Sequence, residues 1–175
     1  MKLRLLIFIV IIFTANCFSQ KTTKSYKLVN RTLIAKINEN DRINFILDKN
    51  ILLNTINREL DEAFKSFDEI SLKSETHKEE NFKYYYLELK SKTSNKTFVK
   101  WLINRNNELY YENSDDEKYS SLNFFVICEG NENCFPRLFF NENKYFWICR
   151  ENPICVTEEE SIKNPCKQTT GFFNE

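Results

Sequence analysis

The sequence of 175 residues is poor in glycine, proline and histidine, with two, three and one of them respectively. A P-loop or a dinucleotide-binding turn needs several glycines where the main chain approaches phosphate, so Gly130 and Gly171 alone exclude both. The single histidine, His77, excludes zinc sites that use two or three imidazole ligands. The 25 basic and 25 acidic residues balance, which argues against a nucleic-acid partner. The composition therefore excludes several classes of function for this protein but does not identify the function itself.

Residues 1–20 have the pattern of a secretory signal peptide. Lys2 and Arg4 precede an unbroken apolar run over 5–13, and a small, polar segment follows it. The run is shorter than the roughly 20 apolar residues of a membrane-spanning helix, but it suits a signal peptide. We therefore predict a protein that is secreted, periplasmic or on the outer surface, with no transmembrane span in the mature chain. Two forms of processing stay open: simple cleavage, for example before Gln20, or lipidation of Cys17, because 14–17 is similar to a degraded lipobox.

Five cysteines remain once Cys17 is set aside, and all of them lie in the last third of the chain. Clustered cysteines in a secreted protein indicate disulfides, and the odd number leaves one thiol over. The pattern aromatic-Phe-x-Ile-Cys-x-x-Asn-x-x-Cys occurs twice, at 124–134 and at 145–155. It favours two local disulfides, Cys128–Cys134 and Cys149–Cys155, with Cys166 free or paired between chains. The alternative scheme joins Cys134 to Cys149 and Cys155 to Cys166.

The cysteine spacing does not suit a metal. Each pair is separated by five residues, which is wider than the spacing that zinc sites use, and the expected compartment is oxidising. We predict no metal site and no cofactor.

Residues 21–175 fit a single α+β domain in length and pattern. A strand is expected over Ser25–Ile37 and a long helix over Asp41–Phe67, where apolar residues recur near the helical period. The charged segment Ser71–Asn81 has no periodicity and is expected to be a loop. Period-two patterns then predict six strands, over Lys83–Lys90, Thr97–Ile103, Glu108–Glu112, Leu122–Cys128, Phe135–Phe140 and Lys144–Cys149.

The expected fold is therefore an N-terminal strand and a long helix packed on an antiparallel β-meander of about five or six strands, stabilised by disulfides at the C-terminal end. Aromatic doublets and triplets on the strands place aromatic side chains on both faces of the sheet. The helix covers one face, and we expect the N-terminal strand and the tail to cover the other. Alternatively, the second face is a partly exposed aromatic surface that binds a protein, a peptide or an apolar ligand. The candidate residues for that patch are Trp101, Tyr110 and Trp147.

Catalytic groups are few. His77 lies in a charged run, so it is expected at the surface rather than as a base for Cys166. The acidic clusters Asp115–Glu117 and Glu158–Glu160 lie in polar surroundings, which favours solvated loops over general acids with a raised pKa. The sequence favours a secreted or envelope-associated, non-enzymatic binding protein whose ligand it does not identify. The alternatives are a small hydrolase that uses paired carboxylates or Cys with His77, an inhibitor or immunity-type protein, and a carrier with an apolar cavity.

Overall fold

The computed structural model describes residues 28–173, except residues 63, 65, 66, 79, 132, 133 and 150–165. The predicted signal peptide, Cys17, Cys155 and Glu158–Glu160 lie outside the described residues. Within them, the helices are α2 (Lys49–Glu59) and the 3-10 helix η1 (Glu117–Asn123). The strands are β1 (Thr32–Ile37), β2 (Ile43–Phe45), β3 (Glu69–His77), β4 (Phe82–Lys90), β5 (Lys96–Arg105), β6 (Glu108–Tyr111), β7 (Phe125–Gly130), β8 (Arg137–Asn141), β9 (Lys144–Ile148) and β10 (Cys166–Gly171). No helix in this part of the chain is long and apolar enough to cross a membrane.

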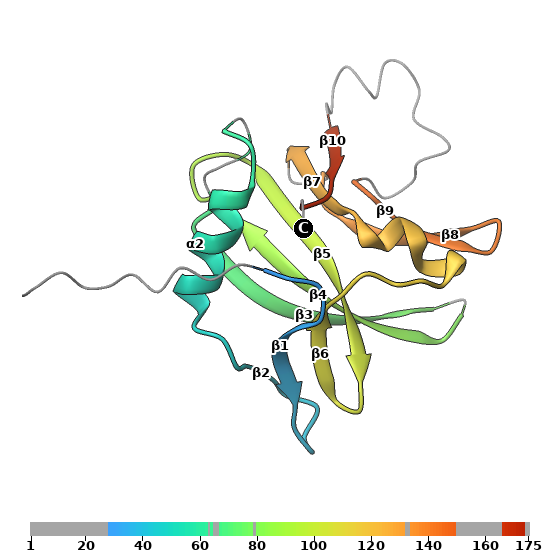
Figure 1. Ribbon diagram of the computed structural model, residues 1–175. Helices are drawn as coiled ribbons and strands as arrows, with labels where there is room; N and C mark the ends of the chain where they lie inside the picture. Colours follow the sequence, from blue (N-terminus) through green and yellow to red (C-terminus); the bar gives the residue numbers. More distant parts are fainter. Residues whose placement is uncertain are drawn as a thin grey trace, which may run out of the picture.

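Eight strands form one antiparallel sheet, in the order β10-β7-β5-β6-β1-β2, and β4 joins this path by pairing with β5 and with β3. Strand β5 holds the sheet together. One of its edges pairs with β4, while the other pairs with β7 over Lys96–Val99 and with β6 over Ile103–Arg105. The sheet curls until β2 lies beside β3. In Figure 1 the β3–β4 and β5–β6 hairpins point in different directions away from this shared strand.

Helix α2 covers the inner face of the curled sheet, as the sequence predicts. Its buried Leu52 and Ile56 pack in one core with Leu87 and Phe98 of the sheet. The predicted length is wrong, because residues 43–45 pair with β1 as a strand and the helix ends at Glu59. The apolar residues before Asp48 alternate with period two, and the Asp48 carboxylate accepts the Asn50 and Ile51 N–H groups. A side-chain cap of this kind begins a helix, so α2 starts there.

The segment predicted as a loop, Ser71–Asn81, is largely strand. β3 pairs with β4 over nine consecutive residues, from Glu69 opposite Lys90 to His77 opposite Phe82. β4 is the only strand with which β3 pairs among the described residues. Charged side chains are common on edge strands, where they discourage pairing with other chains. They also conceal the period-two pattern from which a strand is predicted.

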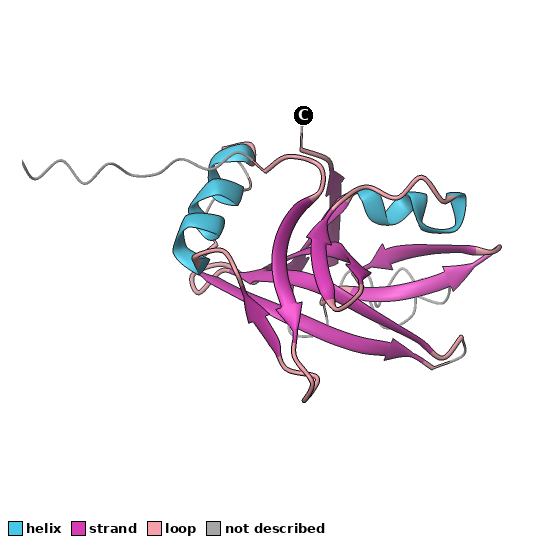
Figure 2. Cartoon of the chain, turned by 60° about the horizontal axis from the view of Figure 1, so that its bottom comes forward, coloured by secondary structure: helices cyan, strands magenta, loops and turns pink. Residues whose placement is uncertain are grey.

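The outer face of the sheet is covered by η1 and by the β8–β9 hairpin, a separate two-stranded sheet. Tyr84, Tyr86 and Trp101 of the main sheet are buried there with Tyr145 and Trp147 of β9. The expectation that the N-terminal strand and the tail cover this face is wrong, because β1 and β10 are strands of the main sheet itself. In Figure 1 the hairpin and α2 lie on opposite sides of β5, and Figure 2 shows the two helices at opposite ends of the strands.

Two disulfides join the C-terminal elements, Cys128–Cys149 and Cys134–Cys166. The predicted disulfide stabilisation is confirmed, but both predicted pairing schemes are wrong, and Cys166 is bonded rather than free. The β8–β9 hairpin folds back over the outer face, so the end of β9 lies over Cys128 in β7. Strand β10 pairs with β7 and places Cys166 opposite Gly130, close to Cys134. Tertiary folding thus brings together cysteines that are distant in the sequence.

Gly171 allows the last strand to lie close to a phenylalanine of β7. A Cβ atom at this position would lie 2.5 Å from the ζ carbon of Phe125, whose ring packs against Phe98 and Phe173. We expect Gly171→Ala to lower the free energy of unfolding by about 1 to 3 kcal/mol, because the ring has to move within a packed core. Urea denaturation measures the change. Lys167→Ala, at an exposed position of the same strand, is the control, and equal stability of the two variants would contradict the prediction.

Candidate ligand-binding cleft

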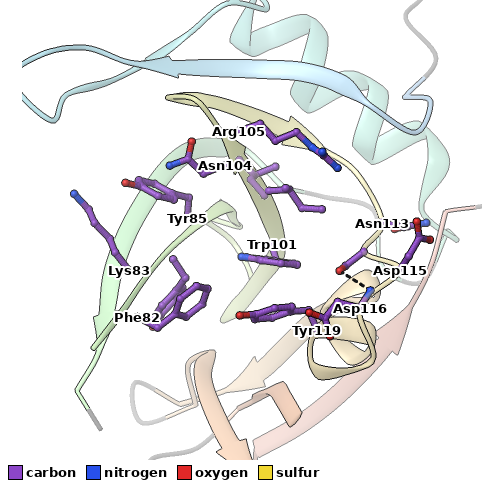
Figure 3. Close-up of a pocket in the computed structure, with 14 residues that line it drawn as sticks. Phe82, Lys83, Tyr85, Trp101, Asn104, Arg105, Asn113, Asp115, Asp116 and Tyr119 are labelled. Carbon is purple, nitrogen blue, oxygen red and sulfur yellow. Dashed lines mark hydrogen bonds between the residues drawn. The ribbon is translucent and has the colours of Figure 1, made fainter. Parts of the chain in front are cut away.

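Strands β4 and β5 separate before either of them ends. Their ladder runs from Lys90–Thr97 to Tyr85–Leu102 and stops there. β4 continues to Phe82 beside β3, and β5 continues to Arg105 beside β6. A cleft of about 410 Å³ opens where the strands separate, and the segment that follows β6 closes one side of it. Figure 3 shows the residues around this cleft.

The edges of both strands line the cleft. Its walls include four consecutive residues of β4, 82–85, and five of β5, 101–105. Side chains of a strand alternate between the two faces, so a hollow on one face would be lined by every second residue. Consecutive lining residues show that the cleft passes between the strands and meets their main chains.

The ladder also shows which main-chain groups face the cleft. The Ser91 N–H donates to the Lys96 carbonyl, and in an antiparallel pair the groups of every second residue point to the partner strand. If the ladder continued in the same register beyond Tyr85 and Leu102, Lys83 of β4 and Asn104 of β5 would form the next hydrogen-bonded pair. Their mutual pair is not formed, since the described ladder ends two residues earlier. The N–H and C=O groups of Lys83 and Asn104 therefore point into the cleft from opposite walls.

Aromatic rings of β4, β5 and η1 form the wall of the cleft on the outer face, and Tyr145 of β9 packs behind them. Trp101 of β5 stacks on Tyr119 of η1 with the ring centroids 5.2 Å apart. The Tyr119 ring in turn stacks parallel to the Tyr145 ring, with the centroids 5.5 Å apart. The centroid of the Phe82 ring lies 5.7 Å from that of Tyr119. Trp101 is only 7% exposed, so its edge rather than its face meets the cleft. In Figure 3 the indole nitrogen lies at the end of the ring nearest Phe82 and Lys83.

The cations on the rim are already paired with acids. Lys83 Nζ lies 3.1 Å from Asp41 Oδ2, and this hydrogen bond raises the pKa of Lys83. Arg105 donates to both carboxylate oxygens of Glu112, at 3.0 and 2.8 Å.

Two acids stand on the other side of the cleft, in the segment between β6 and η1. Asp116 accepts the Lys118 N–H at 2.9 Å and caps η1. Asp115 is exposed and forms no hydrogen bond or ion pair within the described residues. Both carboxylates keep their negative charge at the rim, and that of Asp115 is the one with no hydrogen-bond donor of its own among the described residues.

Glu112 and Lys100 hold the walls in place. Glu112 is buried, and Arg31 binds it at 3.0 Å in addition to Arg105. Lys100 is 1% exposed and donates to the Leu122 and Asn123 carbonyls at 3.2 and 2.7 Å. Its burial lowers the pKa of Lys100 to about 7. These contacts join β5 to β6 and to η1, so the cleft is formed before a ligand arrives.

The structure places the three predicted patch residues in different surroundings. Trp101 lines the cleft. Trp147 of β9 is buried between the hairpin and the main sheet, where its ring contacts Tyr84 and Tyr86. Tyr110 is half-buried on β6 and donates a hydrogen bond to Glu108, and this bond raises the pKa of Tyr110. A binding role for the three residues stays a prediction, and the structure favours Trp101 among them.

Sequence reasoning missed Phe82 and Tyr119. Phe82 lies one residue before the predicted strand Lys83–Lys90. Tyr119 lies between the predicted strands Glu108–Glu112 and Leu122–Cys128, where no element is predicted. A signal for Tyr119 does exist in the sequence, because an aromatic residue inside a charged connection is unusual and often packs. Nothing in the sequence indicated that β4 and β5 would separate.

The residues considered for catalysis lie apart from one another. His77 ends β3 and packs against Phe140 and Tyr145, with its Nδ1 atom buried and without a hydrogen-bond partner among the described residues. The Cys166 thiol forms a disulfide. Glu117 forms an ion pair with Lys144 at 2.6 Å, and the hydrogen bond lowers the pKa of Glu117. A low carboxyl pKa is the opposite of what a general acid needs.

Glu75 is the carboxylate with the most unusual surroundings. It accepts hydrogen bonds from the Tyr84 and Tyr86 hydroxyl groups. Burial, followed by the hydrogen bonds to Glu75, raises the pKa of both tyrosines far above the ordinary value. The cluster joins β3 to β4 and holds both hydroxyl groups in their protonated form, which suits a structural role.

No group of three or more His, Cys, Asp or Glu side chains that could hold a metal ion occurs in the described part of the chain. In comparisons with known proteins, the chain matches no protein-family model, no curated protein and no solved structure.

Proposed function

We propose that the protein is a non-enzymatic, extracytoplasmic binding protein and that its ligand occupies the cleft between β4 and β5. The observation that carries this proposal is the combination of unpaired strand edges and an aromatic wall in one opening. Main-chain groups give a ligand directional hydrogen bonds, and aromatic rings give apolar contact area. The volume of about 410 Å³ lies in the range of small-molecule and peptide sites, about 300 to 1,000 Å³.

The location outside the cytoplasm rests on two features. The first twenty residues have the pattern of a signal peptide, and disulfides persist in oxidising compartments. The two disulfides are compatible with that location.

An apolar-ligand carrier is less well supported than a binder. The enclosed apolar space beneath α2, lined by Leu28, Leu47, Ile51 and Leu52 among others, measures about 30 Å³. A cavity of that size holds about one water molecule. This cavity lies between α2 and the segments that precede it, and it is too small for an apolar ligand. The larger hollow between α2 and strands β3 and β4, about 420 Å³, is lined mostly by polar and charged side chains.

A ligand screen by NMR tests the proposal. The ¹⁵N-labelled protein is exposed in turn to three named classes of probe: tripeptide amides, disaccharides and aromatic carboxylic acids. We expect at least one class to shift the amide signals of residues 82–85, 101–105 and 113–119, which surround the cleft. The absence of shifts with every class, or shifts confined to other residues, would contradict the proposal.

A variant that fills the cleft provides the matched control for that screen. Asp115→Trp places a large side chain at the rim from an exposed position, and Lys167→Trp places the same side chain on β10, away from the cleft. We expect Asp115→Trp to weaken binding of the probe at least about tenfold, which corresponds to about 1.4 kcal/mol. Lys167→Trp is expected to bind as the native protein does. Equal affinities of the two variants would place the ligand elsewhere.

A further inference from the structure

We infer that the occupant of the cleft is an extended peptide segment of a partner protein, which adds as a strand between β4 and β5. The inference rests on the proposed function and names the class of its ligand. Recognition of a peptide by strand addition takes its affinity from main-chain hydrogen bonds and its specificity from pockets for alternate side chains. The cleft offers both.

The main-chain groups of Lys83 and Asn104 face each other across the cleft. In a strand, one residue directs its N–H and C=O to one side, and the next residue directs them to the other side. A peptide lying between the walls would therefore pair one residue with Lys83 and an adjacent residue with Asn104. A sugar or an apolar compound has no such alternation of donors and acceptors, so this arrangement favours a peptide.

The side-chain environments on the two faces of the split differ. Towards the outer face, an inserted strand meets the wall of Phe82, Trp101 and Tyr119. Towards the other face, it meets the polar side chains of Lys83 and Asn104, which are exposed. Alternate residues of a bound peptide then meet an aromatic wall and a polar, hydrated opening. The preferred sequence has an aliphatic or aromatic residue at every second position.

Charge decides which end of the peptide lies near η1. Lys83 and Arg105 are paired with Asp41 and Glu112, whereas Asp115 has no partner within the described residues. A basic side chain near this end of the peptide would neutralise the Asp115 carboxylate. Complementary charges of this kind fix orientation and register more than they raise affinity.

Selection from a phage-displayed library of random heptapeptides tests the inference on the full, disulfide-bonded protein. Binders are selected on the native protein and counter-selected on Asp115→Trp. We expect enriched sequences with apolar residues at alternate positions and with a Lys or Arg at one end. Asp115→Asn is expected to weaken binding of such a peptide about two- to fivefold, with less effect at high salt, as is typical of an exposed ion pair. An unchanged affinity and salt dependence would overturn the assignment of the basic end.

N-methylation of the selected peptide tests strand addition directly. A methyl group on an amide nitrogen removes one main-chain donor without changing the side chain. We expect two adjacent positions to lose about tenfold or more in affinity on N-methylation, while methylation outside this pair changes affinity about twofold or less. Equal sensitivity at every position, or none at all, would overturn strand addition.

The failure of this inference is distinguishable from the failure of the proposed function. If no peptide is enriched but a disaccharide or an aromatic acid shifts the amide signals of the cleft, the cleft binds a ligand of another class and the inference is wrong. If no probe of any class shifts those signals, both the inference and the proposed function are wrong.

Discussion

Replacing Cys128 and Cys149 together by alanine is expected to lower the free energy of unfolding by about 3 to 5 kcal/mol. The two cysteines are 21 residues apart, and closing a loop of this size restricts the unfolded chain by about 3 kcal/mol. Both residues are also buried in the core of the outer face, so their replacement removes packed sulfur atoms. Urea denaturation of the native and variant proteins measures the loss.

The second disulfide provides a matched comparison. Cys134 and Cys166 are 32 residues apart, so the loop term alone is similar, about 3 to 4 kcal/mol. Cys166 is half-buried, and its replacement removes less packing. We therefore expect the Cys134→Ala, Cys166→Ala double variant to lose less stability than the Cys128→Ala, Cys149→Ala one. A disulfide between Cys128 and Cys134, found by peptide mapping without reduction, would contradict the connectivity on which both expectations rest.

The Cys128–Cys149 disulfide also affects the cleft. It fastens the end of β9, and Tyr145 on the same strand stacks parallel to Tyr119 in the aromatic wall. The double variant is therefore expected to bind a cleft ligand more weakly, even under conditions where it stays folded. Near-UV circular dichroism of the aromatic residues and the affinity for the selected peptide measure this effect separately from stability.

The free energy of unfolding is expected to rise with pH between about 7 and 10. Burial lowers the pKa of Lys100 from its ordinary value of 10.5 to about 7, so over this range the unfolded chain binds a proton that the folded protein does not. Stability then increases with pH by up to about 1.4 kcal/mol per pH unit. The Leu122 and Asn123 carbonyls accept hydrogen bonds from the Lys100 amine and favour its charged form. This effect makes the slope of stability against pH smaller than the limit. Below pH 7 both states are protonated at Lys100, and its contribution to the slope disappears.

Two tyrosines reverse the trend at higher pH. The pKa values of Tyr84 and Tyr86 are raised in the folded protein, by burial first and then by the hydrogen bonds to Glu75. Above about pH 10 the tyrosines of the unfolded chain lose their protons while these two keep theirs, so stability falls again. The stability maximum is therefore expected near pH 9 to 10. This is higher than the range of about pH 5 to 8 in which most proteins are most stable.

Lys100→Met isolates the contribution of the buried amine. The variant keeps an unbranched side chain that is one atom shorter and removes the titrating group, so the rise in stability between pH 7 and 10 is expected to flatten. Slopes rather than absolute stabilities are compared, because the variant also leaves the two carbonyls without their donor. Lys90→Met, at an exposed position of β4, is the control and should keep the native slope. Urea denaturation at several pH values, with free thiols blocked, provides the measurement, and an unchanged slope in Lys100→Met would contradict the assignment.

Periodicity predicted the central strands well and the edges of the fold poorly. β4, β5 and β6 lie within one or two residues of their predicted bounds, because each is a short run rich in aromatic and aliphatic residues, which favour strands. In β4 and β5 these residues are buried on both faces of the sheet. The asparagine-rich connections between these predicted strands, 104–107 and 141–143, form tight hairpin turns in which Asn106, Asn107 and Asn143 adopt positive φ angles. β3 was missed because Lys73 and Glu75 conceal its alternation. The predicted helix is too long because strand β2, the capping residue Asp48 and helix α2 follow one another in a single stretch rich in apolar residues.

The candidate site was predictable only in part. Trp101 was named from the sequence because aromatic doublets and triplets on the strands place rings on both faces of the sheet, and the helix covers only one of these faces. Its partners Phe82 and Tyr119 come from other elements, and no local pattern joins them. The main-chain groups of Lys83 and Asn104 carry no sequence signal, because they face the cleft through the loss of a strand pairing and not through their side chains.

By itself, the sequence determined the class of the fold, the presence of disulfides, and the central strands β4, β5 and β6. These features depend on local chemistry: short runs of aromatic and aliphatic residues, and clustered cysteines in an expected oxidising compartment. Only the tertiary structure decided which cysteines pair, what covers the outer face, and where β4 leaves β5. Each of these depends on contacts between residues distant in the sequence, formed when the sheet curls around β5 and the β8–β9 hairpin folds over it.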